Sequence, residues 1–428
     1  MDSRPLLFTK LQNCRSFKIF VLARTLFTLP LLLIFVDARS TFFPIQVVVG
    51  NSNPTNVAAR HHHPTTTAPI ATTYSTSMSA FFRIADRFVQ LLALFRPPID
   101  GIQSVGSVSV EDLGMVWQSI AVQQQQERRF LEYYNNPSSS SSTDDPTTSS
   151  TTTSNDHDPS LVITFHGLAA SPQDDYEPGI PTFELLLEAA DEKGFVLFAP
   201  EARPINFFGL FNIPFILGWN DYGRSYLQPD ADDVAFVLDM IDYAVDTHGV
   251  DRNRVFLAGV SGGGSLVYRL LNEQSDKFAA ATALTATYIR EDDVPPPTLP
   301  YDPTPLLTVI GTRDPFFAFN GGSTVVFDAR SLDDTLQFFA EMNGWAGGTI
   351  SEEAVIDTDA CEVSKITYDH PMYPVESFVI SGGGHLTPGT DLFALYAPII
   401  RLQFGPLRCL TEFPFVPRMI DFFERYGL

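Results

Sequence analysis

An α/β fold with a mostly parallel central sheet and helices on both faces is the fold class that this sequence predicts. From Leu161 onward, short apolar runs alternate with segments of helical periodicity. This alternation is typical of parallel strands joined by helical crossovers. The chain has 428 residues, of which 44% are hydrophobic, and this is enough apolar surface for one large core.

The elements follow from local sequence. Each expected strand is a short, largely apolar run, and each expected helix has apolar residues at helical spacing. The strands are expected at Leu161 to Phe165, Phe195 to Ala199, Arg254 to Ala258, Phe278 to Leu284, Pro305 to Ile310 and Ser377 to Ile380. The helices are expected at Phe183 to Lys193, Asp232 to Thr247, Ser265 to Asn272, Ser331 to Asn343 and Pro417 to Tyr426. A leading antiparallel pair is predicted at Ser104 to Val110 and Arg128 to Tyr134, joined by a polar, glutamine-rich connection.

Residues 1–38 have the pattern of a secretory signal peptide. Basic residues precede an apolar run, Thr25 to Val36, that is too short to span a bilayer. Val36, Asp37 and Ala38 then form a small-residue cleavage site. We therefore expect a secreted protein. A retained signal anchor, which would attach the chain to a membrane, and an organelle transit segment are the alternatives.

The next region, residues 39–100, combines a low-complexity tract with one helix. Ser40 to Ser79 is rich in Thr, Pro, Asn and Ser and cannot bury enough apolar surface to order itself. Its triple histidine is expected to be solvated and to bind no metal. Phe81 to Phe95 has the spacing of an amphipathic helix, expected to dock on the protein. Residues 101–428 then form the predicted catalytic domain, with a flexible Ser/Thr-rich loop at 136–160.

The charge balance excludes some partners. Lys and Arg total 27 against 50 Asp and Glu, so the formal net charge is −23. Such a chain repels phosphate backbones and anionic lipid surfaces. We expect no nucleic-acid partner, and we expect neutral substrates to be favoured over anionic ones.

The segment Val255 to Arg269, VFLAGVSGGGSLVYR, has the pattern of a strand, a sharp turn and a helix. Gly259, Ser261 and Gly263 match G-x-S-x-G, in which glycines allow close backbone approach on both sides of the serine. A bare match to this pattern is weak evidence. The flanking strand and helix strengthen it, and they predict Ser261 as a nucleophile.

A serine nucleophile needs a histidine base and a carboxylate that orients the base. His385 follows three glycines directly after a predicted strand, whereas the alternative, His370, precedes a proline in a polar connection. Asp314 follows a buried strand and a Gly turn, so its carboxylate is expected at the sheet edge of Ser261. The chain order Ser261, Asp314, His385 is that of the α/β-hydrolases.

The site also needs amides that bind an oxyanion. Gly262, directly after the nucleophile, supplies one, and Leu168 on the loop after the first parallel strand is expected to supply the other. His166 would position that loop. A packed strand-end histidine is an equal alternative, and neither role includes proton transfer.

From about Gly106 to the C-terminus the chain resembles the secreted polyhydroxybutyrate depolymerase and feruloyl esterase group of α/β-hydrolases. The matching blocks are FHGLAASPQDDY, ADDVAFV, VDRNRVFLAGVSGGG, DKFAAATAL, GTRDPFFAFNGG and GGGHLTPG. The resemblance implies a serine ester hydrolase without a cofactor or metal, in which Ser261 is the nucleophile, Asp314 the acid and His385 the base. It implies that the oxyanion donors are Gly262 and Leu168.

The expected reaction is hydrolysis of neutral esters, such as hydroxyalkanoate, hydroxycinnamoyl or acetyl esters, through an acyl-enzyme. A serine peptidase of the same fold and a catalytically idle binding protein are the alternatives. The aromatic-rich segment Arg203 to Tyr226 has two interpretations, lining of an acyl pocket and packing in the core, and the sequence favours neither. After removal of the signal, Cys361 and Cys409 are the remaining cysteines. We expect them to form a disulfide, and two buried free thiols are the alternative.

Overall fold

The computed structural model divides the chain into two units, Met1–Tyr74 and Ser75–Leu428. In the first unit only the backbone of three strands is described, and in the second the described residues are 109–122, 126–135, 158–176, 183–207, 211–222, 231–289, 295–324, 328–385, 409 and 412–428. The predicted amphipathic helix at 81–95 and most of the Ser/Thr-rich loop at 136–160 lie outside these ranges. In the part of the chain that is described, no helix combines the length and apolarity needed to cross a membrane.

The first unit contains a three-stranded antiparallel sheet in the order β1-β2-β3. Its strands are β1 (Lys18–Ala23), β2 (Leu32–Asp37) and β3 (Gln46–Val49). The sequence predicts no strands here. The runs LLIFVD and QVVV are nevertheless rich in residues that favour strands. Cleavage after Ala38 is a processing event and stays a prediction.

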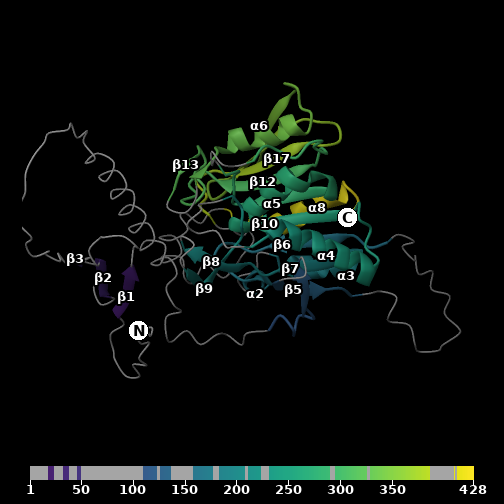
Figure 1. Ribbon diagram of the computed structural model, residues 1–428. Coiled ribbons are helices and arrows are strands. Elements are labelled where there is room, and N and C mark those ends of the chain that lie inside the picture. The colour runs from purple at the N-terminus through teal and green to yellow at the C-terminus, as the bar shows by residue number, and fades with distance from the viewer. Residues whose placement is uncertain are drawn as a thin grey trace, which may run out of the picture. The chain divides into compact units, whose positions relative to one another are not determined.

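A ten-stranded sheet forms the centre of the second unit (Figure 1). In spatial order its strands are β15 (Ile350–Asp357), β16 (Glu362–Tyr368), β17 (Val375–Ile380), β12 (Leu306–Gly311), β11 (Ala280–Leu284), β10 (Val255–Val260), β6 (Leu161–Phe165), β7 (Val196–Pro200), β5 (Gln126–Tyr133) and β4 (Val116–Val122). The strands from β17 to β7 pair in parallel, and at each edge two further strands are added by antiparallel pairing. This strand order is that of the α/β-hydrolase fold, and the predicted fold class is confirmed.

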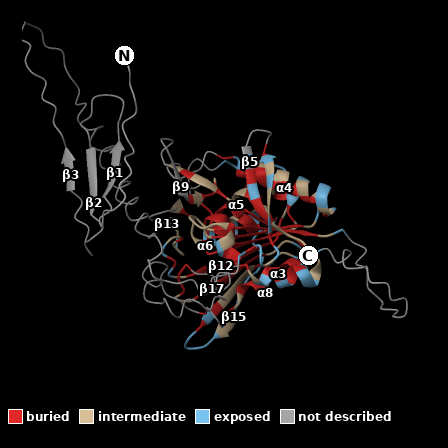
Figure 2. Cartoon of the chain, turned by 90° about the horizontal axis from the view of Figure 1, so that it is seen from below, coloured by how far each residue is buried: buried red, intermediate tan, exposed pale blue. Residues whose placement is uncertain are grey.

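Helices cover both faces of this sheet because each central strand is apolar on both sides. On β6, Ile163 belongs to one core cluster and its neighbour Val162 to the other, as the alternation of side chains along a strand requires. The first cluster includes residues of α4 (Asp233–His248), α5 (Gly262–Gln274) and α6 (Leu332–Met342), and the second includes residues of α3 (Leu185–Lys193) and α8 (Phe415–Glu424). Figure 2 shows the buried residues concentrated in the sheet and on the inner sides of these helices.

The leading antiparallel pair exists, but its first strand is not the predicted one. Residues 104–108 lie outside the described ranges, and Ser109 and Val110 begin a turn. The Ser109 hydroxyl accepts a hydrogen bond from the Asp112 amide at 3.2 Å, and the Asp112 carboxylate accepts one from the Ser109 amide at 3.1 Å. These local bonds favour a turn over a strand. The strand that pairs with β5 is β4, which begins at Val116.

Two hairpins were not predicted. One is β15–β16 at the sheet edge, where the side chains of β15 are mostly exposed. An exposed edge strand carries charged residues and therefore lacks the continuous apolar run on which the predictions relied. The other is β8 (Arg203–Phe207) with β9 (Phe211–Gly218), inside the aromatic-rich segment. Shorter elements are α2 (Pro172–Tyr176), a 3₁₀ turn at Ser275–Lys277, and β13 (Gly322–Ser323) paired with β14 (Asp328–Ala329).

A disulfide joins Cys361 to Cys409, as expected, with their Cα atoms 4.8 Å apart. Both cysteines are buried. The bond ties the start of β16 to the segment that leads into α8, and it closes a loop over a sequence separation of 48 residues. In the chain-entropy view, closing a loop of this length stabilises the fold by about 4 kcal/mol.

Candidate active site

Ser261 lies in the sharp turn between β10 and α5. Its backbone has φ 55° and ψ −118°, a conformation that a residue with a side chain rarely adopts. The turn requires its glycines. A Cβ at Gly259 would lie 2.2 Å from the Gly263 carbonyl oxygen, and a Cβ at Gly263 would lie 2.1 Å from that of Phe165. The G-x-S-x-G pattern therefore corresponds to a backbone that holds the serine hydroxyl out at the end of β10.

The hydroxyl of Ser261 contacts the imidazole of His385. The Ser261 Oγ and His385 Nε2 atoms are 2.8 Å apart, and His385 Nδ1 lies 2.7 Å from Asp314 Oδ2. His385 follows β17 and Asp314 follows β12, which are adjacent parallel strands. The two loops touch at glycines, because a Cβ at Gly311 would lie 2.3 Å from the Gly383 carbonyl oxygen. The structure thus joins the three predicted residues in one hydrogen-bonded chain.

The Asp314 carboxylate is held in one orientation. Its Oδ1 atom accepts hydrogen bonds from the backbone amides of Phe316 at 2.8 Å and Phe317 at 2.9 Å, which leaves Oδ2 facing His385. The rings of Phe316 and Phe317 also pack on the imidazole, one edge-on and one stacked. The Asp314 side chain is fully buried and that of His385 is 7% exposed. Burial and these contacts restrict the imidazole to the plane between the serine and the carboxylate.

The backbone amides predicted to bind an oxyanion lie beside Ser261. A Cβ on Gly262 would lie 3.2 Å from the Leu168 nitrogen, and a Cβ on Gly167 would lie 3.9 Å from the Ser261 hydroxyl oxygen. The Gly262 amide is also the first of α5 and so lacks a partner within its helix. The Leu168 amide therefore lies close to Gly262, the residue directly after Ser261. Of the residues that the structure describes, no group of three His, Cys, Asp or Glu is arranged to hold a metal ion.

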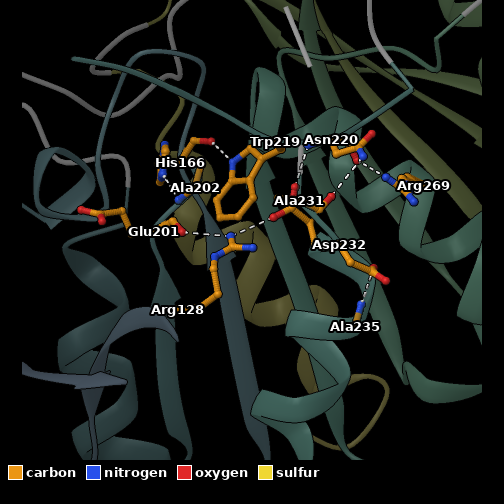
Figure 3. Close-up of polar contacts among 11 residues, drawn as sticks. Arg128, His166, Glu201, Ala202, Trp219, Asn220, Ala231, Asp232, Ala235 and Arg269 are labelled. Carbon is orange, nitrogen blue, oxygen red and sulfur yellow. Dashed lines mark hydrogen bonds and ion pairs between the residues drawn. The ribbon is translucent and has the colours of Figure 1, made fainter. Parts of the chain in front are cut away.

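His166 is buried, and Figure 3 shows it beside Ala202 and Trp219. Its Nε2 accepts a hydrogen bond from the Ala202 amide at 3.1 Å, and its Nδ1 lies 2.8 Å from the Gly167 carbonyl oxygen. An amide can only donate and a carbonyl can only accept, so the ring proton is on Nδ1. Burial lowers the pKa of His166 to about 4, so the imidazole is neutral near pH 7. These contacts agree with a positioning role.

The buried, neutral state of His166 predicts a pH dependence of stability. Unfolding returns its pKa from about 4 to its ordinary value of 6.5. Between these values the unfolded chain binds the proton and the folded chain does not. The free energy of unfolding should therefore fall by about 3 kcal/mol as the pH is lowered from about 6.5 to about 4, and this contribution stops changing below that range. Urea unfolding across this pH range measures the slope.

The measurement is repeated with a test variant and a matched control, in which glutamine replaces His166 or His370. H166Q removes the titrating group and should flatten the slope, whereas H370Q should leave it unchanged. An H166Q slope equal to that of the wild type would contradict the assignment. His370 lies in the turn before β17, where its Nδ1 accepts a hydrogen bond from the Tyr373 amide at 3.0 Å. It takes no part in the Ser261 chain.

Sequence reasoning left open the role of the aromatic-rich segment, and the structure places Trp219 in the core. The residue is 4% exposed, and its indole Nε1 donates a hydrogen bond to the His166 carbonyl oxygen at 2.8 Å. The buried ion pair of Arg128 with Asp233, at 2.8 Å, was not predicted. The two residues are far apart in sequence, and no local pattern joins them.

Comparisons with known proteins show which families this sequence is similar to. The prolyl oligopeptidase family matches residues 217–290, a region that includes the Ser261 turn. The candidate esterase NocK of Nocardia uniformis subsp. tsuyamanensis is 29% identical over 179 residues, which are 38% of this chain and 51% of that protein. Feruloyl esterase B of Piromyces equi is 29% identical over 123 residues, which are 28% of this chain and 23% of that protein. The chain thus spans about half the length, or less, of these curated relatives.

Among solved structures, acetyl xylan esterase from Aspergillus awamori is similar with a TM-score of 0.41 and 12% sequence identity. The similarity covers 68% of this chain and 99% of that one. The sequence relatives confirm the resemblance to esterases that the motif blocks predict. By the strand order of its sheet the chain has the α/β-hydrolase fold, and by these relatives its sequence is similar to esterases.

Proposed function

We propose that this protein is a secreted serine hydrolase of neutral carboxylic esters that acts through an acyl-enzyme. The observation that carries the proposal is the hydrogen-bonded chain from Ser261 through His385 to Asp314, with distances of 2.8 and 2.7 Å. This chain supplies a nucleophile, a base and an orienting carboxylate in one place. The amides of Leu168 and Gly262, two residues that lie close together beside Ser261, are the proposed donors to the ester carbonyl oxygen as it gains charge.

In the first half of the reaction, the Ser261 oxygen attacks the ester carbonyl carbon and its proton moves to His385 Nε2. Asp314 accepts the Nδ1 hydrogen bond and stabilises the imidazolium. The carbonyl oxygen becomes an oxyanion, which accepts hydrogen bonds from the amides of Leu168 and Gly262. When the intermediate collapses, the bond to the leaving oxygen breaks and that oxygen takes the proton from His385. The alcohol departs, and the acyl group stays on Ser261.

In the second half, water replaces the alcohol. His385 Nε2 takes a proton from a water molecule while the oxygen of that water attacks the acyl carbon. The same two amides bind the second oxyanion, and collapse returns the proton to the Ser261 oxygen. The acid leaves, and no cofactor or metal is required by these steps. A neutral imidazole is needed at the start of each half-reaction.

The substrates proposed are hydroxyalkanoate oligomers and hydroxycinnamoyl or acetyl esters. The sequence similarity to a feruloyl esterase supports the class, and the net charge of −23 supports neutral over anionic members. Neither a nucleic acid nor an obligatory protein partner is part of this proposal. A membrane would be a partner only if the N-terminal segment were retained as an anchor.

Substrate charge gives a testable prediction. A neutral hydroxycinnamoyl or hydroxyalkanoate ester should be cleaved faster than an analogue with a free carboxylate near the scissile bond. The difference should shrink as salt is added, because salt screens the repulsion between charges. Initial rates on the matched pair at about 0.02 and about 0.5 M salt measure the effect. Soluble esters should also be cleaved faster than a polyhydroxybutyrate film. Faster cleavage of the anionic analogue or of the film would contradict the proposed substrate class.

Secretion is proposed on two observations. The chain begins with basic residues and a short apolar run, and Cys361 is joined to Cys409 by a disulfide. Disulfides persist mainly in oxidising compartments outside the cytoplasm. Expression of the full chain in a secreting host, followed by N-terminal sequencing of the medium fraction, tests both secretion and the cleavage after Ala38.

A serine peptidase is the second candidate, because the prolyl oligopeptidase family matches residues 217–290. Ester and amide substrates with the same acyl group separate the two activities. An esterase should cleave the ester at a much higher kcat/KM and leave the amide nearly untouched.

The experiment that tests the proposed function is covalent labelling with a fluorophosphonate, which forms a bond to an activated serine. The wild type should be labelled and Ser261→Ala should not. Absence of labelling and of turnover on every ester in the wild type would support a binding protein instead.

A further inference from the structure

The loop that carries Leu168 is fastened at both ends to the end of β9. At one end, the Trp219 indole Nε1 donates to the His166 carbonyl oxygen at 2.8 Å. At the other, the Ala169 amide donates to the Leu217 carbonyl oxygen at 2.7 Å. The amide of Leu168 lies between these two attachments. Figure 3 shows the indole of Trp219 directed at the His166 backbone.

These bonds act on consecutive peptide groups. The His166 carbonyl and the Gly167 amide share one planar unit, and the Leu168 carbonyl and the Ala169 amide share another. The unit between them contains the Gly167 carbonyl and the Leu168 amide. His166 Nδ1 donates to that carbonyl at 2.8 Å. In a trans peptide the N–H points opposite to the C=O, so the Leu168 N–H points away from the imidazole of His166.

The loop does not hold this conformation by local preference. Ala169 has φ 62°, a left-handed conformation that costs a residue with a Cβ about 1 kcal/mol. The conformation therefore depends on the attachments to β9. A loop released at one end would relax, and the Leu168 amide would leave its place beside Gly262.

Trp219 is itself rigidly supported. Its ring packs edge-on against Phe165, with ring centroids 5.5 Å apart. The next residue, Asn220, donates its amide hydrogen to Asp233 Oδ2 at 2.7 Å and accepts a bond from Arg269 on its carbonyl oxygen at 2.5 Å. Asp233 is paired with the buried Arg128. Hydrogen bonds of the next residue thus hold the Trp219 backbone in the core, and Figure 3 shows Asn220 between Trp219 and Arg269.

We propose that Trp219 is a positioning residue for ester hydrolysis, whose indole N–H holds the His166 peptide so that the Leu168 amide faces the oxyanion. The inference rests on the proposed function. It assigns a role in the transition state to a side chain that does not touch the substrate. An amide held in advance stabilises charge without reorganising during the reaction.

The test is Trp219→Phe, which keeps an aromatic ring and removes the N–H. Loss of one oxyanion donor typically lowers kcat by about 100- to 1,000-fold. A misplaced donor should cost part of that effect, so we expect kcat to fall about 10- to 100-fold with KM changed less than about threefold. The matched control is Trp345→Phe. The Trp345 indole packs on Tyr368, and its Nε1 has no hydrogen-bond partner among the described residues. This control should keep wild-type kinetics.

A second readout separates positioning from general damage to the fold. A trifluoromethyl ketone analogue of the ester binds as an adduct in which the Ser261 oxygen bonds to the ketone carbon and the ketone oxygen becomes an oxyanion. Its inhibition constant should rise in Trp219→Phe by the same factor as kcat/KM falls. The product alcohol, which has no carbonyl oxygen and so places no oxyanion against the two amides, should inhibit both proteins equally. The melting temperatures of the two Trp variants should be similar.

Gly218→Ala keeps the test decisive if Trp219→Phe does not fold. The added Cβ would lie 3.0 Å from Leu168 Cδ1 and 2.8 Å from Ile205 Cγ2, so it pushes on the same loop and should lower kcat and weaken the ketone adduct together. A folded variant with unchanged kcat and unchanged adduct affinity would overturn the role of this attachment. A wild type that neither reacts with a fluorophosphonate nor cleaves esters would instead overturn the proposed function.

Discussion

Replacing Ser261 by alanine should lower kcat by about five to six orders of magnitude. The three residues of the hydrogen-bonded chain act as a unit, and without the hydroxyl there is no acyl-enzyme for His385 and Asp314 to assist. The fold should remain, because alanine removes only one oxygen atom and leaves the close backbone contacts at the glycines of the turn unchanged. Steady-state and single-turnover rates on a neutral hydroxycinnamoyl ester give the loss, and circular dichroism with a melting curve checks the fold.

The matched control is Ser265→Ala, one turn further along α5. The hydroxyl of Ser265 is buried and has no hydrogen-bond partner among the described residues, so its removal should leave kcat within about twofold of wild type. If Ser261→Ala kept more than about a hundredth of the activity, the acyl-enzyme mechanism would be wrong.

Replacing Asp314 by asparagine should lower kcat by about four orders of magnitude. The reason is the direction of the hydrogen bonds around the carboxylate. The amides of Phe316 and Phe317 both donate to Oδ1, so the oxygen of the asparagine amide must occupy that position. Its NH₂ group then faces His385 Nδ1 and donates to it, which forces the ring proton onto Nε2. A protonated Nε2 cannot accept the proton of Ser261.

The measurement is the rate as a function of pH. In Asp314→Asn the residual rate should rise with hydroxide, because a base from solution replaces the imidazole. Asp302→Asn provides the control on the exposed loop before β12 and should behave as wild type. A loss of less than about tenfold in Asp314→Asn would show that another group orients His385.

Much of the site could be predicted because its signals are local. Gly259 is required by a contact within the Ser261 turn, and Gly263 by the neighbouring end of β6, so the motif after an apolar strand predicts the conformation. His385 and Asp314 each follow an apolar run and a glycine turn. Parallel strands present their carboxyl ends at one edge of a sheet, so three such positions in the order Ser, Asp, His are expected to converge there.

The errors came where local pattern and tertiary pairing disagree. The apolar alternation at Ser104 to Val110 predicts a strand, but the side chains of Ser109 and Asp112 complete a turn and the strand begins at Val116. The hairpin β15–β16 escaped prediction because its exposed edge strand resembles a polar loop in sequence. Pairing with β17 decides its conformation.

By itself, the sequence determined the α/β class, the Ser261 turn and the residues that meet there, since these depend on periodicity, on a glycine-flanked turn and on the shared edge at which parallel strands end. Only the tertiary structure decided the tautomer of His166 and the place of Trp219. The tautomer depends on the Ala202 amide and the Gly167 carbonyl on opposite sides of one ring. The role of Trp219 depends on whether its N–H faces solvent or a carbonyl on another strand. The bonds of His166 with Ala202 and with Trp219 join residues that are tens of positions apart in sequence, so they form only when the chain has folded.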